Sequence, residues 1–159
     1  MLVNLRWGWE QPVPELGISV FVIPANFGGR KPRSGVKNGE DRLVVLNETA
    51  TAVIEACRGE HEEFVFVYRG KPLKFMNNGG WQRARAAVGL PQVRVHDLKH
   101  TFGRRLRAAG VSLETRKVLL GHKSGDITTH YSAPEIAELL EAANRVAETR
   151  VKTMLRVIA

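Results

Sequence analysis

The sequence predicts a mainly helical α+β fold, in which a small three-stranded antiparallel sheet packs beside a helical bundle. Two runs rich in β-branched and aromatic residues, 18–23 (ISVFVI) and 42–46 (RLVVL), predict strands. The dipeptide Asn38-Gly39 just before the second run is a tight-turn signal, and the region around Trp7 supplies a third strand. After the second strand, apolar residues recur every three or four positions, the spacing of a buried helical face.

The predicted helices are placed by capping residues and by apolar spacing. Asn47 is a good N-cap, and the face behind it carries Ala50, Val53, Ile54 and Cys57. A later helix, over 96–109, should bury Leu98, Phe102, Leu106 and Ala109. The remaining helices are expected over 77–88, from Ser112 to Gly121, over 128–131 and over 134–147.

Length and composition suit one compact domain, or most of one. The chain has 159 residues, of which 43% are hydrophobic. No apolar run approaches the roughly 18–20 residues that span a bilayer, and no signal-peptide pattern is visible. Because the single cysteine, Cys57, cannot form an internal disulfide, we expect a cytoplasmic protein.

Positive charge is concentrated in one stretch. The chain carries 24 Lys and Arg against 16 Asp and Glu, a net charge of +8, and residues 82–123 hold ten of the basic residues and two of the acidic ones. Such a surface attracts a polyanion, most commonly nucleic acid, although a solvated basic face is an equal alternative. The residues expected to contact DNA are Arg83, Arg85, Arg94, Arg104 and Lys123.

Four side chains in or near this stretch suggest phosphate chemistry. His96 and Lys99 share one face at the start of a helix, where backbone N–H groups favour anions. His122 follows Gly121, which allows a sharp turn. Tyr131 ends the polar segment GHKSGDITTHY, whereas a core tyrosine normally lies in an apolar stripe. A capping histidine and a structural tyrosine are the ordinary alternatives.

A lysine outside this stretch could supply a proton. Lys37 lies beside the Asn38-Gly39 turn, so a flexible ammonium at a hairpin tip could reach a leaving oxygen. The alternative is an ordinary exposed hairpin lysine.

Taken in order, these pieces resemble the catalytic domain of the tyrosine recombinases, the phage integrase family. The resemblance covers nearly the whole chain and rests on a lysine before R-x-V-x-L, on H-x-L-R-H-T-F, on A-G-V, on L-L-G-H and on T-T-x-x-Y. The matching residues here are Lys37 with Arg42, Val44 and Leu46; 96–102 (HDLKHTF); 109–111 (AGV); 119–122 (LLGH); and 128–131 (TTHY).

The resemblance implies site-specific DNA recombination, including the integration of phage or prophage DNA. Tyr131 would attack the scissile phosphate of double-stranded DNA to form a 3′-phosphotyrosyl bond, and Lys37 would protonate the leaving 5′ oxygen. His96, Lys99 and His122 would bind the phosphate. The family needs no metal and no cofactor, since protein cations neutralise the transition state. Its members act as homo-oligomers on DNA, with a tetrameric synapse.

The chain departs from the family pattern in two ways. Lys99 stands where the family has arginine, which grips two phosphate oxygens with a planar fork. The first catalytic arginine of the family should precede the 5–7 segment, and Arg6 lies too far along to replace it. We therefore expect residues 1–159 to be a C-terminal catalytic-domain fragment that lacks the N-terminal DNA-binding domain and is poorly active alone. Residues 134–159 would be a helix and tail that can dock on a neighbouring protomer.

Two other functions fit parts of this pattern. His96 and His100, at i and i+4 with Asp97 between them, could form a zinc-protease site, although Lys99 and the surplus positive charge disfavour a metal cation there. Residues 113–131 could instead form a helix-turn-helix around Gly121. The protein would then be a non-catalytic DNA-binding regulator or a degenerate integrase remnant.

Overall fold

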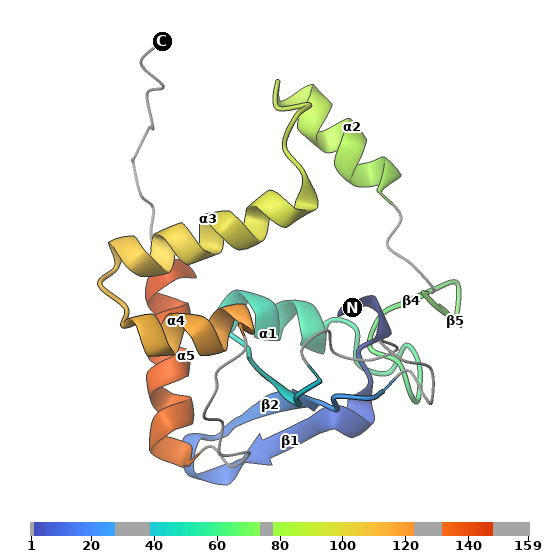
Figure 1. Ribbon diagram of the computed structural model, residues 1–159. Coiled ribbons are helices and arrows are strands. Elements are labelled where there is room, and N and C mark those ends of the chain that lie inside the picture. Colours follow the sequence, from blue (N-terminus) through green and yellow to red (C-terminus); the bar gives the residue numbers. More distant parts are fainter. Residues whose placement is uncertain (1, 28–38, 74–77, 123–131, 148–159) are drawn as a thin grey trace.

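A computed structural model describes residues 2–27, 39–73, 78–122 and 132–147. It has the predicted mainly helical α+β architecture, with a three-stranded antiparallel sheet, five α-helices and a small hairpin (Figure 1). The helices are α1 (Glu48–Glu55), α2 (Gly79–Ala87), α3 (Val95–Ala108), α4 (Leu113–Leu120) and α5 (Ala133–Ala147).

The main sheet has the order β1 (Glu10–Val13), β2 (Ile18–Ile23), β3 (Arg42–Val45), so β2 is central. Val20 pairs with Val45, and Ile23 pairs with Arg42. The predicted strands match β2 and β3, but the third strand begins at Glu10, because the Trp7–Trp9 segment forms a 3₁₀ turn. The hairpin of β4 (Val67–Tyr68) and β5 (Lys71–Pro72) was not predicted.

The helix ends follow the capping rules. The Asn47 side chain accepts a hydrogen bond from the Ala50 N–H at 2.9 Å, and the Ser112 hydroxyl accepts one from the Thr115 N–H at 3.1 Å. Gly121 ends α4 in the left-handed region, with φ of 61°. These three boundaries agree with the sequence-based prediction.

The buried core consists of three clusters. One, under α1, includes Leu5, Phe21, Ile54 and Val65. A second joins the C-terminal half of α3 to α5, and a third joins the sheet to the start of α5. The α1 prediction was partly wrong: Ile54 is buried and Cys57 packs beside it, but the Val53 side chain is 53% exposed.

Helix α5 packs its apolar face against its own chain. Its buried residues are Ile136, Leu139, Ala142, Ala143 and Val146. Two polar contacts add to this packing: the Glu48 N–H donates to Asn144 Oδ1 at 3.1 Å, and the Thr115 hydroxyl donates to Glu138 Oε1 at 2.6 Å. In Figure 1, α5 runs from the edge of the sheet to the end of α3.

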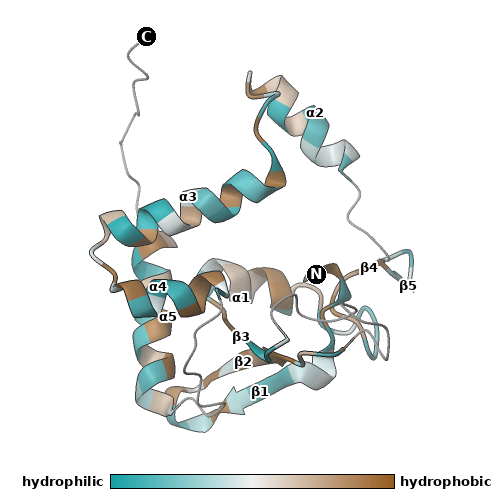
Figure 2. Ribbon diagram, in the orientation of Figure 1, coloured by the Kyte–Doolittle hydropathy of each residue, from teal (hydrophilic) through white to brown (hydrophobic). Residues whose placement is uncertain are grey.

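Helix α2 lies apart from the sheet and contains no buried residue (Figure 1). The adjoining end of α3 is also open, and polar residues predominate along α3 (Figure 2). The prediction that Leu98 belongs to the core is therefore wrong, since it is 49% exposed, whereas Leu106 is fully buried. In the described part of the chain, no helix has both the length and the apolar character to cross a membrane.

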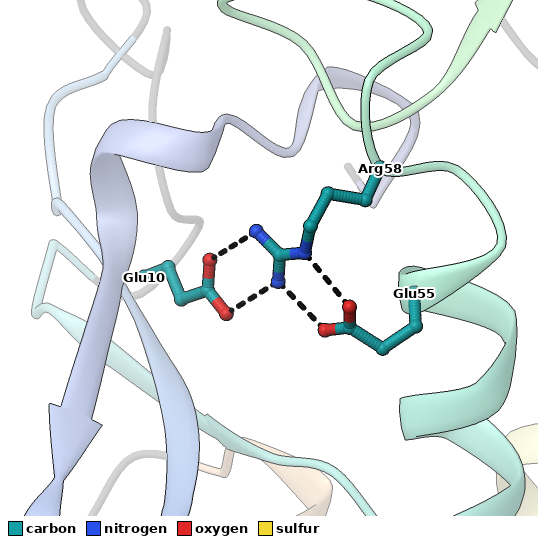
Figure 3. Close-up of polar contacts among 3 residues, drawn as sticks. All are labelled: Glu10, Glu55 and Arg58. Atoms are coloured by element: carbon teal, nitrogen blue, oxygen red, sulfur yellow. Dashed lines mark hydrogen bonds and ion pairs between the residues drawn. The ribbon is translucent and has the colours of Figure 1, made fainter.

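Arg58 ties the N-terminal strand to α1. Its guanidinium donates hydrogen bonds to Glu10 at 3.0 and 3.2 Å and to Glu55 at 2.6 and 2.8 Å (Figure 3). It also lies 4.5 Å from the ring centroid of Trp7. Side-chain hydrogen bonds to the two carboxylates raise the pKa of Arg58.

Candidate functional site

His96 lies in the first turn of α3, as predicted, and Lys99 lies at the start of the second turn. Asp97 stabilises this helix end, because its carboxylate accepts a hydrogen bond from the Arg94 backbone N–H at 2.8 Å. The imidazole of His96 is exposed and the Lys99 side chain is partly buried. Both groups therefore stand at a helix N-terminus, where the partial positive charge of the backbone attracts an anion.

The two histidines of α3 contact each other. The ring centroids of His96 and His100 are 4.8 Å apart, and the rings are nearly perpendicular at 88°. Within the described ranges, no group of three or more His, Cys, Asp or Glu residues is placed to hold a metal ion. Within these ranges, His96 and His100 therefore have no third His, Cys, Asp or Glu placed with them as a metal ligand.

Helices α3 and α4 meet closely at Gly103. A Cβ atom at position 103 would lie 3.2 Å from Cδ1 of Leu120, so glycine permits this approach. Lys99 lies one turn before Gly103 on α3, and His122 lies two residues after Leu120. The contact thus fixes the end of α4 relative to the helix that carries Lys99.

His122 projects from a corner that Gly121 makes possible. The His122 N–H donates to the Lys117 carbonyl at 2.9 Å, which closes the last turn of α4. Gly121 has φ of 61°, a conformation that favours glycine. The His122 side chain is exposed.

Arg42, at the start of β3, lies against this corner. A Cβ atom at position 121 would stand 2.8 Å from both Cζ and Nε of Arg42. The Nε atom is buried and has no hydrogen-bond partner among the described residues, and burial lowers the pKa of the guanidinium. Burial also lowers the pKa of Lys99, and the charge of Arg42 lowers it further, so these two cations influence each other.

Sequence reasoning treated Arg42 only as part of a strand motif. The signal that could have identified it is a charged residue opening an otherwise apolar strand, RLVVL. Three other predicted site residues, Lys37, Lys123 and Tyr131, lie outside the described residues. Among the predicted site residues, the structure therefore connects Lys99 and His122, because α3 contacts α4 and Arg42 lies beside the end of α4. His96 lies three residues before Lys99 on α3.

The predicted DNA-binding arginines have different surroundings. Arg83 on α2 and Arg104 on α3 are exposed. Arg85 donates from Nη1 to the Val93 carbonyl at 2.7 Å, and Arg94 forms an ion pair with Asp97 at 3.1 Å. Arg83 and Arg104 are therefore the better candidates for contact with a polyanion.

Arg6 is occupied by structural contacts. Its guanidinium forms an ion pair with Glu63 and lies 4.9 Å from the ring centroid of Phe64. A backbone bridge also joins Arg6 to Phe64. These contacts join the Arg6 side chain and backbone to the 63–64 segment.

Comparison with known proteins supports the resemblance found in the sequence. The model of the phage integrase family matches residues 19–138. This range includes β2 from its second residue onward, the whole of β3, the whole of α1 to α4, and the candidate residues on them. No solved structure gives a significant match.

Curated relatives are similar over most of the chain. It is 35% identical over 135 residues to tyrosine recombinase XerC of Rhizobium meliloti, an alignment that covers 78% of this chain and 42% of that protein. It is 32% identical over 151 residues to tyrosine recombinase XerC of Agrobacterium fabrum, covering 88% and 47%. The integrase of Salmonella phage P22 is 29% identical over 116 residues, covering 65% and 30%. The chain thus spans less than half the length of these relatives.

Proposed function

Because the chain belongs to the phage integrase family, we propose that it acts in site-specific DNA recombination, cutting and rejoining DNA through a covalent bond to Tyr131. The observation that carries the proposal is the placing of Lys99 and His122 on two helices that touch at Gly103 and Leu120. A cation on one helix and an imidazole just after another helix that touches it suit the recognition of one phosphodiester.

The proposed reaction conserves the free energy of the cleaved phosphodiester bond in the bond to tyrosine. The Tyr131 hydroxyl attacks phosphorus, the bond to the 5′ oxygen breaks, and a 3′-phosphotyrosyl bond forms. Lys37 gives a proton to the departing 5′ oxygen, while His96 and His122 hydrogen-bond the phosphate and one of these two imidazoles accepts the phenol proton. Rejoining reverses these steps with a new 5′ hydroxyl, so no outside energy source is needed.

The proposed partner is double-stranded DNA. The +8 net charge and the exposed Arg83 and Arg104 support this choice. We further propose that protomers assemble on DNA as a tetramer, with residues 134–159 as the docking segment. Since α5 buries its apolar face in its own chain, docking would use residues 148–159 or would require α5 to exchange partners.

The single free Cys57 supports a reducing, cytoplasmic setting.

A trapping assay on DNA of random sequence tests the proposal whatever the target site is. The chain is mixed with a pool of random-sequence duplexes carrying a nick near the centre, so that cleavage releases a short strand and leaves the adduct trapped. Covalent adducts are isolated under denaturing conditions and sequenced. Because the chain contains two tyrosines, Tyr68→Phe is a matched control for Tyr131→Phe.

Because we expect the chain to be poorly active alone, the unmodified chain should form a small amount of adduct, Tyr68→Phe should form as much, and Tyr131→Phe should form none. DNA binding without any adduct would instead identify a non-catalytic DNA-binding protein. Lys99→Arg should increase the yield, because a guanidinium can hold two phosphate oxygens at once. An unchanged yield would show that lysine is fully adequate at this position.

A further inference from the structure

Arg42 has surroundings that an ordinary strand residue does not need. It occupies the first position of β3, pairs with Ile23, and has a partly buried side chain. Among the residues that the structure describes, no ion pair includes Arg42, and its buried Nε has no hydrogen-bond partner. Keeping a buried guanidinium donor unpaired costs stability, so a purely structural role would be served better by an apolar side chain.

Two acidic residues that flank the site in sequence make hydrogen bonds to other groups. Asp41 accepts a hydrogen bond from the Ala25 N–H at 2.8 Å. Asp97 is held by the backbone and side chain of Arg94. Arg42 acts on two other neighbours: its guanidinium lies against the end of α4, and its charge lowers the pKa of Lys99.

At the end of α4, the guanidinium packs against the backbone of Gly121. The C-terminal end of a helix carries partial negative charge, which suits a cation. A side chain at position 121 would force the end of the Arg42 side chain to shift, and this contact lies one residue before His122. A shift of Arg42 would therefore be transmitted directly to the corner from which the imidazole projects.

Arg42 also lies where the elements bearing the candidate groups converge. β3 begins at Arg42, α3 bears Lys99, and His122 lies two residues after the end of α4. We propose that Arg42 is a positioning residue: it braces the Gly121–His122 corner against β3 and repels the Lys99 ammonium, directing both groups toward one phosphate. This inference rests on the proposed recombinase function and adds to it a residue that does not itself touch DNA.

The first test needs no DNA. Lys99 and His122 are followed by NMR during a pH titration of the full chain and of Arg42→Met and Arg42→Lys. Removing the charge in Arg42→Met should shift the titration of Lys99 to higher pH, whereas Arg42→Lys should keep most of the original value. The ring signals of His122 should move in both variants, because neither side chain reproduces the planar contact with Gly121.

Two controls separate positioning from general damage. Arg69→Met removes a positive charge from the β4–β5 hairpin and should leave the signals of Lys99 and His122 unchanged. Thermal unfolding identifies any variant that is not folded, and Arg42→Lys retains both charge and most of the aliphatic stem if Arg42→Met is unstable. Unchanged Lys99 and His122 signals in a folded Arg42 variant would overturn the proposal.

The second test uses the trapped-adduct assay. Arg42→Met should slow adduct formation by about tenfold to a hundredfold, the usual consequence of misplaced catalytic groups. The Kd for DNA should change by no more than about twofold, and the salt dependence of binding should be retained, since the residue makes no phosphate contact. A parallel loss of affinity and salt dependence would identify a direct phosphate ligand and reject the positioning role.

The two proposals fail in different ways. If no Tyr131 adduct forms with any variant, recombination is rejected, while the NMR titration still decides whether Arg42 organises Lys99 and His122. If the adduct forms equally fast with Arg42→Met, the recombinase function stands and the role of Arg42 is rejected.

Discussion

The guanidinium of Arg42 fills the space in which a side chain at Gly121 would begin, with Cζ and Nε both 2.8 Å from the Cβ position. The side chain of Arg42 therefore restricts which residue can stand at position 121, although the two residues are far apart in the sequence. Two features favour glycine at position 121. Its φ of 61° is rarely adopted by other residues, and the Arg42 side chain occupies the space of a Cβ atom. Most glycines at helix ends face only the first requirement.

Gly121→Ala should therefore be more damaging than the same change at another helix end. Gly110 has φ of 72° and open space around its Cβ position, so Gly110→Ala should cost only the backbone strain, about 1–2 kcal/mol. Gly121→Ala should cost up to about 1 kcal/mol beyond that, because the end of the Arg42 side chain must move. Denaturant unfolding measures both. In an Arg42→Ala chain, Gly121→Ala should lose no more free energy of unfolding than Gly110→Ala does. Equal losses of unfolding free energy at the two glycines in the original chain would contradict the packing argument.

The close approach of α3 and α4 predicts a size limit at Gly103. Gly103→Val should displace Leu120 and reduce the free energy of unfolding by about 1–3 kcal/mol, as for other overpacked contacts. Gly80→Val on α2, where no atom lies within 4 Å of the Cβ position, is the matched control and should have a much smaller effect. Leu120→Ala should partly restore stability to Gly103→Val, and no such rescue would argue against this contact.

Asp97 should stabilise α3 in a pH-dependent way. The side-chain hydrogen bond from Arg94, followed by that from its backbone N–H, lowers the pKa of Asp97. A carboxylate with a lowered folded-state pKa contributes stability above its unfolded pKa, about 3.9, and loses it as the pH falls through the folded value. Asp97→Asn should thus be less stable than the original chain at pH 7, and the difference should shrink as the pH falls below about 4.

Unfolding curves at several pH values measure this difference in stability. The Asp97→Asn change is made both in the original chain and in a chain that carries Arg94→Gln. Asp97→Asn should have a smaller effect there, because only the backbone hydrogen bond is left. A stability difference that stays constant between neutral and acidic pH would exclude the charged interaction.

Arg58 should not be replaceable by lysine without loss. A lysine ammonium cannot form paired hydrogen bonds to both Glu10 and Glu55 as the planar guanidinium does (Figure 3). Because the pairs are solvent-exposed, we expect Arg58→Lys to cost no more than about 1 kcal/mol. The loss should diminish in about 1 M salt, which screens exposed charges. An equal loss at low and high salt would point to packing on Trp7 instead.

Local signals allowed much of the fold to be predicted. Asn47, Ser112 and Gly121 mark helix boundaries because capping depends on residues a few positions apart. The burial of Leu98 was predicted wrongly for a physical reason. Periodicity identifies one face of α3, but the core contacts lie beside its C-terminal half, so Leu106 is buried and Leu98 is not.

The candidate site was predictable only in part. His96 and Lys99 could be placed on one helix face from their spacing. The proximity of Arg42 to Gly121 and Lys99 could not, because it arises from packing between β3, α3 and α4. Sequence patterns reveal which residues share an element, whereas contacts between distant elements depend on how the clusters pack.

The packing of helix α5 determines how cooperatively the molecule unfolds. Ile136 packs with the sheet, while Ala142 and Val146 pack with α3, so one helix belongs to both apolar clusters. Sheet and helices should consequently lose protection against hydrogen exchange together, in one cooperative opening. The amides of α2, which alone among the described α-helices has no buried residue, should exchange well before that event.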